Sequence, residues 1–206
     1  MNRLRRPALA AIAAMALMAV VGASTASATV LCKNSTSTTK CTDDYASGTA
    51  FEATLTTGST YVFETSGGTT LDTCTGSTIK GQTTNTGSST STLEIFLSSK
   101  SWGSCSFTTI TLKVGDFEIH HIAGTDSGTL TEVHGSETTL NTIFGTCVYG
   151  SGSALNLGTL VGGNPAAIVI NTSMPKISGN FACPSTGILT ANYTVTSPKP
   201  LYVSAG

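Results

Sequence analysis

Residues 189–196 read LTANYTVT, and this stretch decides the fold class. Leu189, Ala191, Tyr193 and Val195 are apolar and alternate with threonine or asparagine. Successive side chains of a β-strand point to opposite faces of a sheet, so the alternation predicts a strand with one buried face. The branched threonine side chains favour an extended backbone, and their hydroxyl groups suit a face exposed to solvent.

The same period of two recurs along most of the chain, for example at residues 51–56, 93–97 and 109–114. Glycine-rich segments such as 67–68 and 162–165 separate these runs and are typical of turns. Outside the N-terminal region, no window shows the 3.6-residue apolar repeat of a helix. The pattern predicts an all-β fold of roughly a dozen short antiparallel strands, arranged as a sandwich or, alternatively, as a closed β-barrel.

The first 28 residues have the features of a signal peptide. Three arginines precede an apolar run at residues 8–21, and the sequence ASA at 26–28 fits the small-residue cleavage pattern. The apolar run is too short to predict a membrane-spanning helix, and no second such run follows it. We therefore expect removal of residues 1–28, and a single secreted, extracellular domain at 29–206 that does not insert into a membrane.

The charge of the expected mature chain limits its partners. All three arginines belong to the leader, so residues 29–206 carry seven lysines against eleven acidic residues, a net charge of −4. Nucleic acids and anionic membranes are bound mainly through clusters of lysine and arginine. A weakly acidic chain without arginine is therefore not expected to bind nucleic acid.

All six cysteines follow the leader. An exported domain of this kind is expected to form three disulfides. Zinc is not expected, because there is no Cys-x-x-Cys pair and no cysteine close to a histidine. Local pairing is favoured, because each bond then joins the ends of a segment that folds back on itself. The single tryptophan, Trp102, is expected to lie in a loop and to pack on a disulfide. The predicted disulfides are Cys32–Cys41, Cys74–Cys105 and Cys147–Cys183.

The sequence DSGT at residues 126–129 matches short motifs around the serine of chymotrypsin-like proteases and the acid of aspartic proteases. The context of both motifs is missing. His120 lies too close to Ser127 in the chain, and neither an oxyanion loop nor a second acidic loop is present. Residues 124–128 are therefore predicted to form the turn of a hairpin, and no catalytic residue is predicted.

The two strands beside this turn carry acids and histidines. A turn centred on Asp126 would pair Ile119 with Val133, and a shift by one residue would place Ile119 against a charged or polar side chain. The predicted register gathers acids and histidines on one face. Such a face can hold a divalent metal ion or titrate near neutrality, and otherwise it is an exposed polar face with ordinary cross-strand pairs. No other cofactor is expected. The face consists of Asp116, Glu118, His120, Glu132 and His134.

Four segments resemble a family of small, threonine- and glycine-rich secreted proteins of actinobacteria. They are DFEIHHIAGTDSGTLT at 116–131, LDTCT at 71–75, GGNPA at 162–166 and SPKPLYV at 197–203. The similarity extends over nearly the whole mature chain. It implies export and a β-rich fold, and it assigns no activity and no catalytic or binding residue.

These observations predict a non-catalytic extracellular or cell-envelope protein with a binding or surface-structural role. One alternative is a secreted hydrolase that uses paired acids such as Glu118 and Glu132. Another is a barrel that carries a small ligand. A cleft with an acid pair would favour the hydrolase, an enclosed apolar cavity would favour ligand carriage, and a flat threonine-rich sheet would favour a surface role.

Overall fold

Strands form nearly all the regular structure of this protein. The computed structural model describes residues 29–36, 40–88, 91–142 and 145–206, so the predicted signal peptide lies outside the described residues. Within those ranges the chain forms fourteen strands and no helix. None of the described residues belongs to a helix long and apolar enough to cross a membrane. The strands are β1 (Val30–Cys32), β2 (Ala50–Leu55), β3 (Tyr61–Thr65), β4 (Thr70–Thr83), β5 (Leu93–Cys105), β6 (Thr108–Lys113), β7 (Asp116–His121), β8 (Gly128–Val133), β9 (Glu137–Thr142), β10 (Gly145–Gly150), β11 (Leu155–Val161), β12 (Ala167–Gly179), β13 (Thr186–Ser197) and β14 (Tyr202–Ser204).

Twelve of these strands build one closed antiparallel barrel. Strands β2 and β3 both pair with β13 on one side and with β4 on the other, so they lie end to end as one interrupted strand. In the same way β6 continues into β7, β8 into β9, and β10 into β11. Counted in this way, the barrel has eight strands, and strands that follow one another in the chain are neighbours in the wall. This is an up-and-down barrel, the second of the two architectures that the sequence left open.

Three neighbouring strands of the wall are interrupted by short connections, at residues 114–115, 134–136 and 151–154. In the middle connection, His134 and Gly135 both have left-handed backbone conformations, with φ angles of 60° and 61°. A side chain on Gly135 would place its Cβ only 2.4 Å from the carbonyl oxygen of Ser151. Only glycine therefore lets the two connections approach so closely.

The barrel wall has a seam along one edge of β5. Strand β5 pairs with β7 only at Leu93–Ile95, and β6 pairs only with β9 among the described strands. The Asp116 carboxylate accepts a hydrogen bond from the Leu97 amide at 3.1 Å, which extends the contact slightly beyond the ladder. Residues 98–104 then pair with β4 alone.

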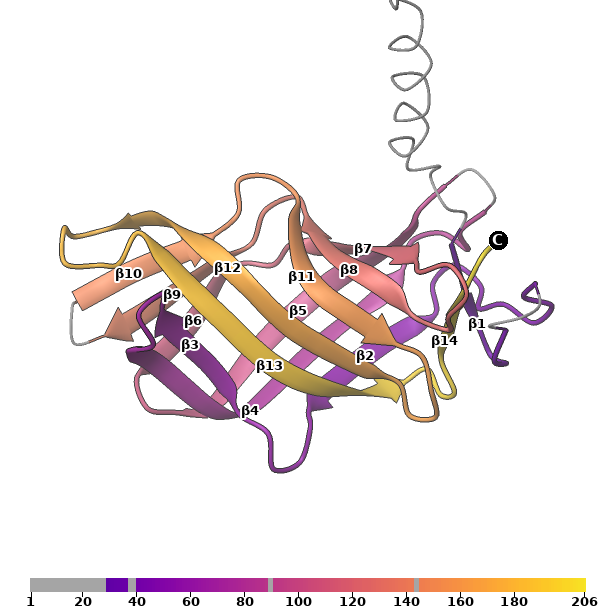
Figure 1. Ribbon diagram of the computed structural model, residues 1–206, viewed down its shortest axis with the longest axis horizontal. Coiled ribbons are helices and arrows are strands. Elements are labelled where there is room, and N and C mark those ends of the chain that lie inside the picture. Colours follow the sequence, from indigo (N-terminus) through magenta and orange to yellow (C-terminus); the bar gives the residue numbers. More distant parts are fainter. Residues whose placement is uncertain (1–28, 37–39, 89–90, 143–144) are drawn as a thin grey trace, which may run out of the picture.

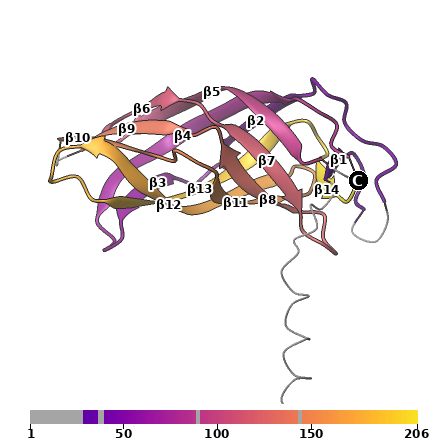
Figure 2. The same ribbon diagram turned by 90° about the horizontal axis from the view of Figure 1, so that it is seen from above.

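The two ends of the barrel differ. At one end β1 pairs with β14, the Val203 amide bonds to the Asp126 carbonyl oxygen at 2.9 Å, and Leu31 is fully buried. Figure 1 and Figure 2 both show β1 and β14 at this end of an elongated barrel and β10 at the other. The β1–β14 end holds the Cys32–Cys41 disulfide, and the opposite end holds Cys74–Cys105 and Cys147–Cys183. All three predicted pairs are confirmed.

The barrel interior is filled by the apolar residues that the alternation predicts. Leu189, Ala191, Tyr193 and Val195 are all buried, whereas the threonines between them are more exposed. Phenylalanine and tyrosine side chains are the largest buried groups. The all-β antiparallel prediction is therefore confirmed, and the core is the inside of the barrel.

Candidate functional site

A pocket in the barrel interior is lined by both aromatic and charged side chains. The space in it that a water-sized molecule can occupy is about 30 Å³, so the lining side chains fill most of it. A concave, largely apolar space with a few polar groups is the usual form of a small-molecule site. The lining consists of Tyr61, Ile79, Lys100, Trp102, Phe117, Glu132, Ser136, Thr138, Leu157, Ile170, Met174, Leu189 and Tyr193.

An ion pair lies in the wall of this pocket. The ammonium group of Lys100 on β5 bonds to the carboxylate of Glu132 on β8. The Glu132 side chain is fully buried, and that of Lys100 is 11% exposed. The hydroxyl group of Ser136 donates a hydrogen bond to the second carboxylate oxygen of Glu132. Both oxygens of the buried acid are therefore paired.

The same lysine also contacts an aromatic ring. Its Nζ lies 5.7 Å from the centre of the Phe117 ring, within the range of a cation–π interaction. Removing two charges from water costs about as much free energy as their attraction recovers, so a buried ion pair contributes little net stability. An ammonium group has three donors, and one of them is used by Glu132. Lys100 is thus equipped to donate a hydrogen bond to an acceptor in the pocket.

Aromatic side chains form another part of the pocket lining. The rings of Tyr61 and Trp102 lie 4.4 Å apart, with an angle of 53° between their planes. The Tyr193 hydroxyl donates to the Ser77 hydroxyl oxygen at 2.9 Å. Burial raises the pKa of Tyr193 to about 12 and raises the pKa of Tyr61 well above 10.0. Both phenols therefore remain neutral near pH 7, and the ion pair is the pocket's charged feature.

The pocket reaches solvent beside β5. Of its lining residues, only Lys100 and Trp102 are partly exposed, and both lie on β5. They belong to residues 98–104, whose second edge has no strand partner among the described residues. The seam in the barrel wall is therefore the natural entrance to the pocket.

Of the five acids and histidines that the sequence placed on one face, four lie on the outer surface of the barrel and Glu132 lies inside. The predicted register is wrong, because Ile119 pairs with Leu130 and not with Val133. The turn spans residues 122–127, where the Ile122 amide bonds to the Ser127 carbonyl oxygen at 2.9 Å. The Asp126 carboxylate instead binds outside the turn, accepting hydrogen bonds from the Ser35 hydroxyl at 2.5 Å and the Thr36 amide at 2.7 Å. The hairpin turn itself is confirmed.

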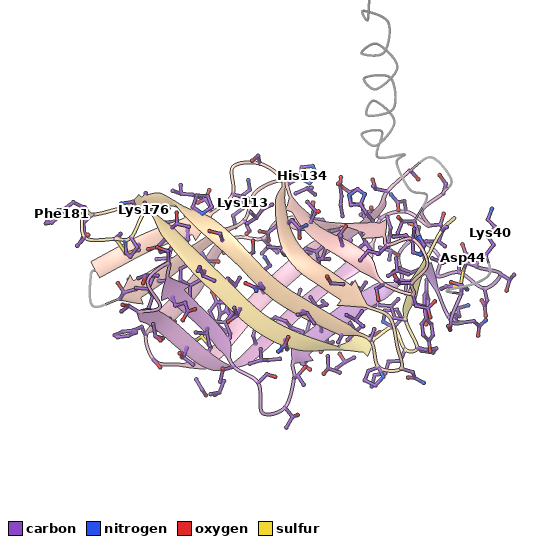
Figure 3. All side chains as sticks on the ribbon, viewed as in Figure 1. Lys40, Asp44, Lys113, His134, Lys176 and Phe181 are labelled. Atoms are coloured by element: carbon purple, nitrogen blue, oxygen red, sulfur yellow. A yellow bond between two sulfur atoms is a disulfide. The ribbon has the colours of Figure 1, made fainter. Side chains whose placement is uncertain are left out.

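The five predicted site residues fall into three groups. His134 contacts Asp116 at 3.0 Å, and Figure 3 shows His134 on the outside of the barrel wall. His120 contacts Glu118 at 3.5 Å, also on the outer surface. Glu132 points inward, opposite Phe117. No two of these groups form a common metal-binding arrangement among the described residues.

The acid pair suggested for a hydrolase is separated in the same way. Glu118 lies on the outer surface opposite Thr131, whereas Glu132 lies inside and is bound by Lys100. Two carboxylates on opposite faces of a barrel wall do not flank one substrate bond. The paired-acid hypothesis therefore loses the pair on which it rested.

One cluster does have metal-ligand spacing, formed by Asp72, Cys74 and Cys105. Both cysteines are joined in a disulfide, so neither offers a thiolate. The buried Asp72 carboxylate accepts hydrogen bonds from the amides of Thr73 at 2.8 Å and Phe107 at 2.9 Å. Its role is to hold the turn between β5 and β6.

Sequence reasoning missed Lys100, Trp102 and Ser136. The alternation Leu93, Ile95, Leu97 predicts that the next inward residue is Ser99. A bulge breaks the register at this point, because Gly81 pairs with Leu97 while Lys80 pairs with Ser99. The extra residue turns Lys100 and Trp102 toward the interior. Trp102 thus lies on a strand and contacts Tyr61, and its predicted place in a loop is wrong.

The chain matches no protein-family model, no curated protein and no solved structure.

Proposed function

We propose that this protein is a secreted, non-catalytic binding protein of the extracellular space or cell envelope that carries one small, mostly apolar ligand inside its barrel. The observation that carries the proposal is the interior pocket, in which aromatic side chains surround the Lys100–Glu132 ion pair. Eight-stranded up-and-down barrels are just wide enough to hold one small ligand. Three disulfides are compatible with an oxidising environment outside the cell.

The pocket limits the chemistry of the ligand. Lys100 and Glu132 neutralise each other, so the site favours an uncharged molecule with one hydrogen-bond acceptor that can meet Lys100. The tilted rings of Tyr61 and Trp102 favour a planar apolar body. The free space between the side chains is narrow, so entry requires a change of rotamer. Met174 in the wall is flexible enough to provide it.

A fluorescent naphthalene ketone, Prodan, tests the proposal directly. Its carbonyl oxygen is an acceptor, and its emission shifts to shorter wavelength in an apolar site. Trp102 is the only tryptophan and lies in the pocket wall, so energy transfer from Trp102 to the probe reports binding at this place. We expect saturable binding of one probe molecule per chain, with quenching of Trp102 emission.

Two lysine variants serve as a matched pair. Lys100→Met removes the donor in the pocket and should weaken Prodan binding by about tenfold. Lys80→Met removes an exposed lysine on β4, whose partner is Glu52 at 3.5 Å, and should leave binding unchanged. Absence of saturable binding to the wild type, or an equal loss in both variants, contradicts the proposal.

A further inference from the structure

The loop between β12 and β13 presents a fully exposed phenylalanine. Phe181 is 101% exposed, whereas the other large exposed apolar side chains of the described residues range from 38% to 48%. Figure 3 shows Phe181 projecting at the tip of this loop, at the far end of the molecule from Lys40 and Asp44. Burial of an apolar side chain of this size normally lowers the free energy, so the full exposure of Phe181 requires a reason.

The loop that carries Phe181 is firmly held. The Asn180 side-chain oxygen accepts hydrogen bonds from the amides of Ala182 at 2.9 Å and Cys183 at 3.2 Å. Cys183 is bonded to Cys147 on β10, and Lys176 donates to the Cys183 carbonyl oxygen at 3.1 Å. The loop is thus fixed on both sides of the exposed ring.

Two further contacts anchor the second half of this loop. The Tyr149 hydroxyl donates to the Pro184 carbonyl oxygen at 3.1 Å, and the Lys176 amide donates to the Ser185 carbonyl oxygen at 2.9 Å. An apolar side chain that is already held in place loses little conformational entropy on docking. Phe181 therefore has the properties of a preorganised anchor.

Lys176 of β12 is the charged group that contacts the Phe181 loop, and its ammonium group is turned onto the backbone carbonyl oxygens of Asn180 and Cys183. Three described turns lie at this end of the barrel, at residues 66–69, 106–107 and 180–185, and none of them contains an ionisable side chain. The turn at 106–107 adds a second exposed ring, Phe107, which is 38% exposed. We call these three turns the Phe181 end. The opposite end is charged, and its described loops carry Lys33, Lys40, Asp43, Asp44, Asp126 and Lys199.

The chemistry of the Phe181 end fits one kind of surface. Phenylalanine is one of the residues with which peripheral proteins enter the boundary between headgroups and acyl chains. Anionic lipids attract lysine and arginine clusters, and the described turns of this end have none. The net charge of −4 on residues 29–206 also opposes binding to an anionic surface. A zwitterionic lipid surface satisfies all three conditions.

We propose that the Phe181 end docks on a zwitterionic lipid surface by inserting Phe181 and Phe107 at the headgroup level. This inference goes beyond ligand carriage and does not depend on it, because it concerns turns on the outer surface and none of their residues lines the pocket. In this orientation the long axis of the barrel points away from the lipid surface, and the charged β1–β14 end lies in water.

Flotation with phosphatidylcholine vesicles tests the proposal on the purified wild-type chain. We expect the protein to float with these vesicles, and no more strongly when phosphatidylglycerol is added. Phe181→Ser should lower the bound fraction by about tenfold. The control is Phe96→Ser, because Phe96 is 48% exposed on the side of the barrel and should contribute nothing. Thermal melting should show both variants folded, since neither ring is buried.

A spectroscopic readout follows insertion itself. In a chain with Trp102→Phe, the substitution Phe181→Trp should give tryptophan emission that shifts to shorter wavelength on addition of phosphatidylcholine vesicles, and Phe96→Trp should give no shift. The proposal is overturned if the wild type does not float, if Phe96→Ser loses as much binding as Phe181→Ser, or if binding requires phosphatidylglycerol. Capture of a protein by the Phe181 end without vesicle binding would also overturn it.

Discussion

Lys100 on β5 reaches Glu132 on β8 inside the barrel, although β7 lies between these two strands in the sheet order. The contact is possible because β5 separates from β7 beyond Leu97, so the lysine side chain spans the seam from the inside. The pair therefore joins the two sides of the wall at its weakest place. This gives the ion pair a structural role beside the ligand-binding role that we propose.

The first prediction concerns the energy of this pair. Lys100→Met leaves the Glu132 carboxylate buried with Ser136 as its remaining partner, and should lower the free energy of unfolding by about 3 to 5 kcal/mol. The double variant Lys100→Met with Glu132→Leu removes both charges and should cost clearly less than the sum of the two single changes. Guanidinium unfolding measures all three values. Additive costs would show that the two charges do not interact.

The outer surface supplies the control for this experiment. Lys80 and Glu52 lie 3.5 Å apart with side chains 55% and 37% exposed. Breaking such a pair by Lys80→Met should change the free energy of unfolding by less than about 1 kcal/mol. A large effect here would mean that the lysine variants act through something other than loss of a buried partner.

The second prediction uses a close approach between a glycine and an aromatic ring. A Cβ atom on Gly187 would lie 2.1 Å from the Phe63 ring. That ring is fully buried and packs against Tyr149 at 4.8 Å, so it has no room to move. Gly187→Ala should therefore destabilise the fold by about 1 to 3 kcal/mol. Gly152→Ala is the control, because nothing lies within 4 Å of a Cβ at that position. Equal melting temperatures for the two variants would contradict the packing.

The third prediction tests the metal site that the sequence suggested. Asp116 pairs with His134, Glu118 pairs with His120, and Glu132 lies inside the barrel. Zinc ions should therefore leave the melting temperature unchanged at neutral pH, and a chelator should have no effect. If zinc does shift the melting temperature, the double variant His120→Gln with His134→Gln shows whether these two histidines bind the ion. A zinc-dependent shift that this variant abolishes would contradict the separation of these residues.

The sequence was sufficient to predict the all-β fold and the three disulfides, because both depend on local patterns. Alternation at Leu189, Ala191, Tyr193 and Val195 reports burial of one strand face, whatever surface that face meets. Closure into a barrel depends on which distant strands pair, for example β13 with β2 and β3, and alternation contains no such information. Sandwich and barrel were therefore equally compatible with the pattern.

The candidate site could not be predicted for two local reasons. The bulge at Leu97–Ser99 changes which residues face inward. No residue in the serine-rich run at 98–104 is typical of a bulge at this position. The turn at 122–127 sets a register three residues away from the predicted one, and its Asp126 binds Ser35 and Thr36 of the N-terminal segment, which no local pattern indicates. Both shifts reverse the inside and outside of a strand. Glu132 was consequently placed on the wrong face.

The last prediction concerns alkaline pH. Burial raises the pKa of Tyr193 to about 12 and that of Tyr61 well above 10.0, while both groups in the unfolded chain titrate near pH 10. Below pH 10 both states hold the phenol proton, so the contribution of these tyrosines to stability is fully present. As pH rises from about 10 to about 12, the unfolded chain loses protons that the folded chain keeps, and Tyr193 alone removes about 3 kcal/mol of stability. Phenolate absorbance of Tyr61 and Tyr193 should therefore develop together with loss of the circular dichroism signal. In Tyr193→Phe the decline in stability over this pH range should be smaller by a similar amount, although the variant also loses the hydrogen bond to Ser77. Ionisation of all five tyrosines while the circular dichroism signal stays intact would show that Tyr61 and Tyr193 ionise in the folded barrel, and would contradict the rise in their pKa values on burial.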